Sequence, residues 1–263
     1  MGRMTSTSQF DVMDPARAAA LLVALGRDGR VQAGDALPPF FHHLYFWDAQ
    51  PPSALGPDGH PKVGGLIPDM GLPRRMWAGG RLEFAAPLRA GVPAEKRSTC
   101  AAATRKEGRS GPLAFVTLRH EFWQEGALCV TEHQDLVYRE TADPAQPKPT
   151  PTVARTDEEA SREAAFGTTL LFRYSALTFN GHRIHYDETY ARTAEGYDGL
   201  VVHGPLLAQL LMLMASDEAA LSRFAFRASS PLMHWETATL CRNGADAWVR
   251  GPDGRQVMTA TIN

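Results

Sequence analysis

Polar and hydrophobic residues alternate along four segments in the first half of the chain, with the period of two that is typical of half-buried β-strands. A loop at Trp123–Gly126, with glycine in its last position, joins the last two segments as a hairpin. We therefore expect strands at Arg81–Phe84, Arg97–Thr104, Leu113–Phe122 and Leu128–Tyr138.

Two further segments of this half predict elements that pack against those strands. Pro15–Leu25 is rich in alanine and leucine, has proline in its first turn and stops before Gly26, which predicts a helix. Phe40–Trp47, with the sequence FFHHLYFW, is dense in aromatic side chains and lies between two proline pairs. A segment so bulky is expected in the core, where histidines 42 and 43 would serve packing.

The second half has a similar order of elements. Thr169–Thr178 reads as a strand, and Leu200–Met214 reads as a helix that is apolar on nearly all sides. Such a helix, followed by consecutive strands, predicts an antiparallel sheet wrapped around a buried helix. The strands that follow are expected at Phe224–Phe226, Trp235–Cys241, Ala247–Arg250 and Gln256–Ile262.

A proline-rich segment divides the two halves. Thr141–Asp157 contains four prolines and few aliphatic residues, which predicts an extended linker. We expect an N-terminal domain at 1–140, the linker at 141–157 and a C-terminal domain at 158–263. The predicted class is α+β, with two antiparallel sheets that each surround a central helix, of which Phe40–Trp47 is the N-terminal counterpart.

Composition and charge exclude several classes of protein. Hydrophobic residues make up 44% of the 263 residues and charged residues 21%, which excludes a disordered or fibrous chain. The net charge of −2 offers no basic field for nucleic acid. The longest apolar stretch, Leu206–Ala215, is broken by Gln209 and is too short to span a membrane. Charged residues near the N-terminus argue against a signal peptide, so a cytoplasmic protein is expected.

No motif in the sequence predicts a metal or a cofactor. Cys100, Cys129 and Cys241 are scattered and lack the paired spacing of zinc ligands or of a disulfide framework. Cys129 lies in an alternating apolar run and is expected to be a buried structural thiol. No glycine-rich dinucleotide motif follows a predicted strand. We therefore expect neither metal nor cofactor.

The richest group of polar side chains lies within Ser175–Tyr190. Asn180, His182, Arg183 and His185 follow a turn signal at the end of an apolar segment, where functional residues often lie. Asp187 is placed to cap a short helix. A solvated loop without function is the alternative interpretation of the same residues.

Val201–Pro205 precedes the apolar helix and predicts a second functional feature. Pro205 fits the first turn, so Gly204 would lie at the helix start with a free N–H and no side chain to obstruct a ligand. The positive end of the helix dipole suits a developing oxyanion. An ordinary buried helix start is the alternative.

These motifs resemble those of a known family. Arg173–Ala191, followed closely by Gly199–Pro205, is similar to the MaoC-like hydratase branch of the hotdog fold. The resemblance is greatest to its two-part members, which include mitochondrial-type 3-hydroxyacyl-thioester dehydratases and mesaconyl-CoA and itaconyl-CoA hydratases. The N-terminal half resembles their dehydratase-like hotdog at Gly56–His60, Leu72–Gly80, Gly108–Pro112 and His133–Arg139. The resemblance implies a double hotdog.

The family's signature is Gly-Asp-x-Asn-Pro-x-His, whose Asp and His activate a water molecule. Here His185 holds the His position, Asn180 replaces the Asp, His182 replaces the Asn and Arg183 replaces the Pro. An amide cannot accept the proton, but its oxygen can orient a water. The resemblance therefore implies that His185 and Asn180 are catalytic, with the N–H of Gly204 as the oxyanion donor.

The implied reaction is reversible addition of water to an α,β-unsaturated acyl-CoA thioester, without metal or redox cofactor. A C5 dicarboxylic substrate such as mesaconyl-CoA or itaconyl-CoA is favoured, with Arg183 first and Arg75 second as partner of its free carboxylate. Coenzyme A phosphates need cations, for which arginines 74 and 173 are further candidates. The remaining expected binding residues are His182, Tyr186 and His203.

Three other functions use the same fold. The first is a 3-hydroxyacyl-thioester dehydratase, whose substrate is a fatty acyl thioester. The second is a protein that only binds acyl thioesters, because the replacement of the family's Asp by Asn180 abolished catalysis. A thioesterase needs an acidic group on the central helix, whose body offers only Gln209. A homodimer of two-part chains is compatible with this architecture, and no nucleic-acid or membrane partner is expected.

Overall fold

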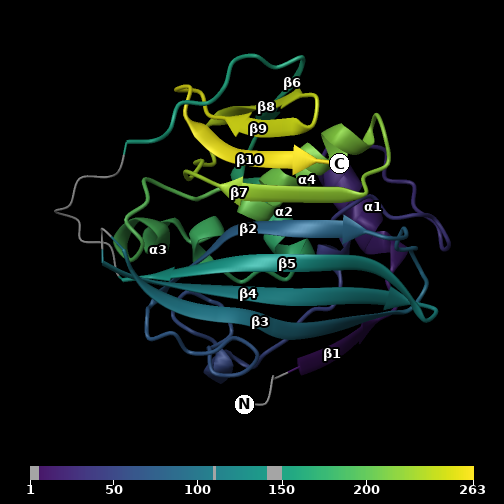
Figure 1. Ribbon diagram of the computed structural model, residues 1–263, viewed down its shortest axis with the longest axis horizontal. Coiled ribbons are helices and arrows are strands. Elements are labelled where there is room, and N and C mark those ends of the chain that lie inside the picture. Colours follow the sequence, from purple (N-terminus) through teal and green to yellow (C-terminus); the bar gives the residue numbers. More distant parts are fainter. Residues whose placement is uncertain (1–5, 109–110, 141–149) are drawn as a thin grey trace.

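The computed structural model describes residues 6–108, 111–140 and 150–263. Their strands form one antiparallel sheet in the order β1-β3-β4-β5-β2-β7-β10-β9-β8-β6 (Figure 1). The first part of the chain supplies β1 (Ser6–Asp11), β3 (Ala94–Gly108), β4 (Gly111–Gln124), β5 (Ala127–Arg139) and β2 (Arg74–Phe84). The second part supplies β7 (Arg223–Ala228), β10 (Gln256–Ile262), β9 (Asp246–Arg250), β8 (Thr237–Asn243) and β6 (Ala160–Ala165).

The two parts meet where β2 pairs with β7, so the two predicted sheets join edge to edge into one. Gly79 pairs with Arg227 and Gly80 with Phe226 at this seam. A Cβ atom added to Gly79 would lie 2.5 Å from the carbonyl oxygen of Phe226. The glycine pair is therefore required by the close approach of the strands rather than by a turn.

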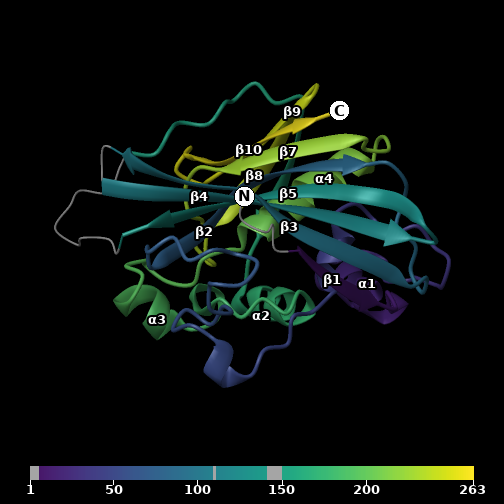
Figure 2. The same ribbon diagram turned by 60° about the horizontal axis from the view of Figure 1, so that its bottom comes forward.

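Helices cover one side of the sheet, where Figure 2 shows α1 (Pro15–Ala24), α2 (Thr168–Leu177) and α3 (Glu188–Thr193) together. The predicted central helix is α4 (Gly204–Ser216), which packs against β7, β8, β9 and β10. Most of its side chains are buried, as its apolar sequence predicts, and Gln209 donates from Nε2 to the carbonyl oxygen of Pro39 at 2.8 Å.

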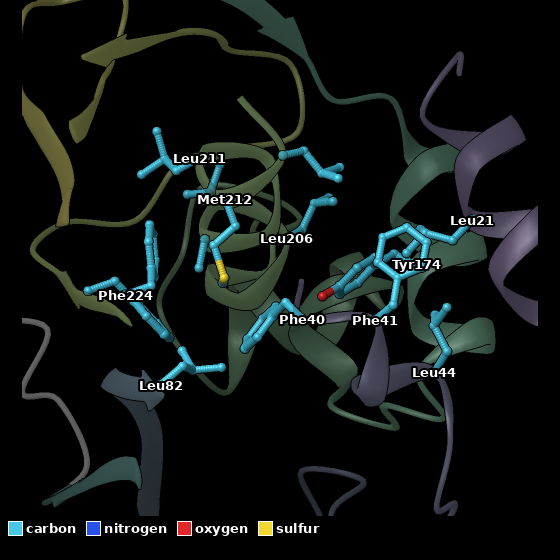
Figure 3. Close-up of a cluster of buried hydrophobic side chains, with 14 of the residues drawn as sticks. Leu21, Phe40, Phe41, Leu44, Leu82, Tyr174, Leu206, Leu211, Met212 and Phe224 are labelled. Carbon is cyan, nitrogen blue, oxygen red and sulfur yellow. The ribbon is translucent and has the colours of Figure 1, made fainter. Parts of the chain in front are cut away.

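The Phe40–Trp47 segment lies in the core, as predicted, although only Phe41–Leu44 is helical and forms a 3-10 turn. Phe40 and Phe41 are fully buried, whereas Trp47 is 38% exposed. Figure 3 shows Phe40 and Phe41 in one cluster with Leu206, Met212 and Phe224, among other side chains from both parts. The two parts therefore share a core.

The predicted strand at Thr169–Thr178 is wrong, because the structure forms helix α2 there. Leu171, Tyr174 and Ser175 are buried, which are positions i, i+3 and i+4 of one helix face, while Phe172 and Arg173 between them are exposed. The segment TLLFRYSALT was predicted as a strand because its composition favours strands, although its buried positions follow the period of a helix.

The structure also adds two strands that the sequence did not predict. Strands β1 and β6 form the two edges of the sheet and carry mostly exposed side chains, so they lack the alternation that marks half-buried strands. Of the predicted linker, residues 141–149 lie outside the described residues. After them, Ala154 donates its N–H to the carbonyl oxygen of Gly254 at 2.9 Å. Among the described helices, none has the length and apolar content required to cross a membrane.

The seam predicts a specific cost for a side chain at Gly79. Gly79→Ala forces a methyl group against the backbone of β7, and we expect the free energy of unfolding to fall by about 1–3 kcal/mol. Urea unfolding measures this change. Gly65→Ala is the control, because a Cβ atom there meets nothing within 4 Å, and equal stability of the two variants would contradict the seam argument.

Candidate active site

His185 is held in one tautomer by the backbone. It ends the 3-10 turn Arg183–His185, is buried, and its Nδ1 lies 2.7 Å from the carbonyl oxygen of Val201. A carbonyl oxygen only accepts, so Nδ1 carries the hydrogen and Nε2 carries the lone pair. Nε2 has no hydrogen-bond partner among the residues that the structure describes. Burial, followed by the nearby His182, lowers the pKa of His185 to about 3, which leaves a neutral imidazole.

His203 fixes the plane of the His185 ring. The two rings stack with centroids 3.6 Å apart and planes 20° apart. Nε2 of His203 lies 2.8 Å from Oγ of Ser175, which anchors it to helix α2. Burial, together with His185 and His182, holds the pKa of His203 well below its usual range. His203 is therefore a neutral imidazole that packs against the ring of the candidate base.

Gly204 begins helix α4 directly after His203, so the helix start adjoins the stacked imidazoles. Its N–H donates to no residue in the described part of the chain. A Cβ atom added to Gly204 would meet no atom within 4 Å, so open space lies beside it. An oxyanion donor needs a free N–H beside open space, so the role expected of Gly204 at the positive end of the helix dipole stays a prediction.

Asn180 lies at the end of the turn that follows helix α2, five residues before His185. Its Oδ1 accepts the N–H of His182 at 3.0 Å, and one lone pair of that oxygen remains for a second donor. Phe179 before it has a φ of +51°, an uncommon conformation for a bulky residue. Tyr186 donates its hydroxyl to the carbonyl oxygen of Gly181 at 2.8 Å, which closes the loop on itself.

A loop from the first part of the chain presses against this turn. The backbone N–H of Arg183 donates to the carbonyl oxygen of Asp58 at 2.9 Å, and the rings of His60 and His182 lie 4.6 Å apart. A Cβ atom added to Gly59 would lie 2.0 Å from the carbonyl oxygen of Gly181. The N-terminal Gly56–His60 motif and the C-terminal polar cluster therefore form one site.

The side chain of Arg183 is already paired. Its Nη2 lies 2.7 Å from Oδ2 of Asp187, its Nη1 donates to the carbonyl oxygen of Pro57 at 3.0 Å, and its guanidinium covers the ring of Tyr190. Asp187 also caps α3, as predicted. Arg183 is therefore a structural clamp in this geometry rather than a free partner for a substrate carboxylate.

The other candidate arginines differ in their surroundings. Arg74 pairs with Glu195 at 2.7 Å, and Arg173 is exposed on α2. Arg75 is half-buried and has no ion pair with a described residue. Burial, followed by the charges of Arg75 and then Arg74, lowers the pKa of His182 to about 4, so both charges reach the site and Arg75 is the one of the two that has no ion pair with a described residue.

A cavity of about 520 Å³ lies between the two parts of the chain. Ser175, Asn180, Gly181 and Tyr186 line it from the second part. The first part contributes side chains that the sequence analysis did not assign to the site, and these include His42, His43, His60, Lys96 and Phe122. The adjacent histidines in the aromatic segment were expected to pack in the core. They are buried or half-buried, but they also face this cavity.

Among the described residues, two groups of side chains hold ligand-type atoms within 4.8 Å of one another, and each could accept a metal ion. In the first, the imidazoles of His42 and His43 both contact the carboxylate of Glu132. The second consists of Asp58, His60 and His182 beside the active-site turn. Hydrogen bonds account for the first group without an ion.

Comparison with known proteins identifies the family. Residues 40–234 match the family described as hydroxyacyl-thioester dehydratase type 2. The chain belongs to this family. A relative named mesaconyl-C(4)-CoA hydratase, from Chloroflexus aurantiacus, is 46% identical over 89% of this chain and 86% of its own. The mitochondrial hydroxyacyl-thioester dehydratase type 2 of Schizosaccharomyces pombe is 28% identical over 78% of this chain and 77% of its own. The enzyme is accordingly a hydro-lyase that acts on acyl-CoA thioesters.

Solved structures agree on the fold. HtdX of Mycobacterium tuberculosis has a TM-score of 0.68 at 17% identity, with 98% of this chain and 99% of that chain covered. A second protein of the same organism, described as a double hotdog, has a TM-score of 0.62 at 12% identity, with 100% and 95% covered. The predicted double hotdog is confirmed.

The contact between the two loops predicts that Gly59→Ala damages the site. The new methyl group would displace the Gly181 turn, and we expect kcat/KM to fall by about 100-fold, because small displacements of catalytic groups are costly. Gly64→Ala is the matched control, since Gly64 also has a positive φ but open space around its Cα. Equal losses in steady-state assays of both variants would attribute the effect to backbone strain alone.

Proposed function

We propose that the enzyme reversibly hydrates a C5 dicarboxylic α,β-unsaturated acyl-CoA thioester, of which mesaconyl-CoA is the first candidate. The chemistry rests on His185, whose Nδ1–H is held by the Val201 carbonyl while Nε2 keeps its lone pair. The choice of substrate is supported by the relative that is 46% identical and is named for mesaconyl-C(4)-CoA. Itaconyl-CoA is the related alternative within this class.

In the proposed mechanism, a water molecule lies between Nε2 of His185 and the free lone pair of Asn180 Oδ1. As the water oxygen bonds to the β-carbon, Nε2 accepts its proton and the thioester carbonyl becomes an enolate. The N–H of Gly204 donates to this developing oxyanion. Return of a proton from the imidazolium to the α-carbon gives the 3-hydroxy product and restores the neutral base.

The replacement of the family's Asp by Asn180 assigns the proton transfer to a single group. The side-chain amide of Asn180 cannot accept a proton near neutral pH. It therefore orients the water, while His185 alone serves as the base. His182 and Tyr186 are proposed to flank the thioester near this turn. Arg75, the half-buried candidate cation without an ion pair to a described residue, is proposed for the coenzyme A phosphates.

A fatty acyl substrate is the second candidate, because the Schizosaccharomyces relative is named hydroxyacyl-thioester dehydratase. That substrate needs a long apolar tunnel. The cavity near Asn180 includes His42, His43 and Lys96 beside many aromatic lining residues, and these polar groups favour an acyl chain that carries a charge. We also propose a cytoplasmic homodimer, which light scattering of the purified protein and cell fractionation would test.

Removal of the base gives the direct test of this mechanism. We expect His185→Ala to lower kcat on mesaconyl-CoA by about 10²–10⁴-fold, the usual loss for a general base, with an unchanged thermal midpoint. Asn180→Ala should lose less, because orienting water is a smaller task. The assay follows the absorbance of the conjugated thioester, and full turnover by His185→Ala would refute the mechanism. Asn180→Asp with the activity of the parent would make the amide incidental.

The environment of His185 predicts an unusual pH profile. A base must be neutral to accept a proton, and burial lowers the pKa of His185 to about 3. We therefore expect kcat/KM to stay level from about pH 8 to pH 5 and to fall only as the pH nears 4. An ordinary imidazole would instead give an acid limb near pH 6.5, about its unperturbed pKa. Circular dichroism across the range separates this limb from acid unfolding.

A further inference from the structure

Polar side chains interrupt the apolar inner face of the sheet in the first part of the chain. In the register of the strands, Ser98 on β3 lies opposite His120 on β4, and His120 lies opposite Glu132 on β5. Lys96 lies two residues before Ser98 and opposite Phe122, on the same face. The inner face of a hotdog sheet normally packs against apolar side chains, so this group calls for a specific reason.

Glu132 is fully buried, and its charge is balanced by two imidazoles. Its carboxylate lies 3.0 Å from Nε2 of His42 and 3.1 Å from Nε2 of His43. Burial alone would raise the pKa of Glu132, but these two partners hold it well below the usual range. The carboxylate is therefore ionised and occupied by its histidine partners.

Lys96 differs from its neighbours because its charge has no partner. Its Nζ forms no ion pair and no hydrogen bond with any residue of the described ranges, and it lies 5.9 Å from the ring centroid of Phe122. Burial lowers the pKa of this ammonium, while Glu132 and the exposed Asp48 oppose the shift. An unpaired ammonium in such a place costs free energy unless a ligand compensates it.

The position of Lys96 indicates what that ligand is. Lys96 and His43 line the same 520 Å³ cavity as Asn180, so an anion beside them would belong to the molecule that reacts at the turn. In a C5 unsaturated diacid, the second carboxylate is only a few bonds from the carbon that takes up water. A carboxylate therefore has to be bound inside this cavity, not at the surface.

We propose that Lys96, assisted by His43, binds the free carboxylate of the substrate and so selects dicarboxylic over simple unsaturated acyl thioesters. This subsite rests on the proposed function, and it replaces the paired Arg183 as the carboxylate partner. Each half of the chain then has one task, since the second half supplies the base and the oxyanion donor while the first half recognises the acyl group.

The test compares two thioesters that differ by one carboxylate. Mesaconyl-C(4)-CoA has a carboxylate on the β-carbon, and crotonyl-CoA has hydrogen in its place. We expect Lys96→Met to lower kcat/KM for the diacid by about 10- to 100-fold, the usual value of a charged hydrogen bond, and to change the value for crotonyl-CoA by less than about threefold. Lys96→Arg keeps the charge and should keep most of the preference for the diacid.

Lys106→Met is the matched control. Lys106 is on the same strand and its Nζ lies 5.6 Å from a phenylalanine ring, but it is exposed and lies outside the cavity lining. Its substitution should leave both rates unchanged. The thermal midpoint of Lys96→Met should equal or exceed that of the parent, because a half-buried charge without an ion pair has been removed.

The remaining outcomes separate the two proposals. Equal losses on both thioesters would assign Lys96 to coenzyme A or to folding and would overturn the carboxylate subsite. An unchanged preference in Lys96→Met would overturn it as well, while the proposed function would survive. A parent enzyme that hydrates crotonyl-CoA but not mesaconyl-CoA would overturn the proposed function together with the subsite.

Discussion

The close approach of β2 and β7 at Gly79 and Gly80 is the constraint on which the rest of the molecule depends. It allows two half-sheets to continue as one, and it brings the Phe40 segment of the first part onto the core of the second. The cavity of the candidate site is lined from both parts, so its shape is set by how the parts are joined. A side chain at the seam would therefore alter the site as well as the stability.

Electrostatics gives the active-site turn and the cavity beside it two different environments. At the turn, burial is the largest cause that lowers the pKa values of His182, His185 and His203, and nearby arginines or histidines add to it. The stacked rings of His185 and His203 therefore remain neutral, and His185 presents one lone pair beside a helix start. On the other side, the carboxylate of Glu132 is shared by two imidazoles and the ammonium of Lys96 is unpaired. The turn thus holds a neutral candidate base, while the first part of the chain places a cation on the lining of the cavity that Asn180 also lines.

Much of this arrangement could be predicted from the sequence, and the failures have physical reasons. The long strands were predicted from alternation, because burial of one face requires an apolar residue at every second position. Helix α4 was predicted from its continuous apolar run, because it is buried on nearly all sides. The edge strands β1 and β6 bury too few side chains to show such a pattern. Helix α2 was predicted as a strand because its sequence is rich in residues that favour strands. At the site, His185 was predicted and remains a proposal for catalysis. Arg183 was favoured for substrate binding although Asp187 lies four residues later, the spacing of a helical ion pair, and the structure pairs them.

Lys96 was overlooked for a different reason. It lies one residue before the strand predicted at Arg97–Thr104. Only the register of β3, in which Lys96 is opposite Phe122 and Ser98 is opposite His120, reveals that it lies on the inner face. This also explains why a two-part chain suits the reaction. In a symmetric dimer of identical hotdogs, every residue occurs twice in equivalent surroundings, so each hotdog would have to carry both the buried charges and the catalytic turn. A fused pair can keep Glu132 and Lys96 in one half and the catalytic turn in the other, so each costly group occurs only where it is used.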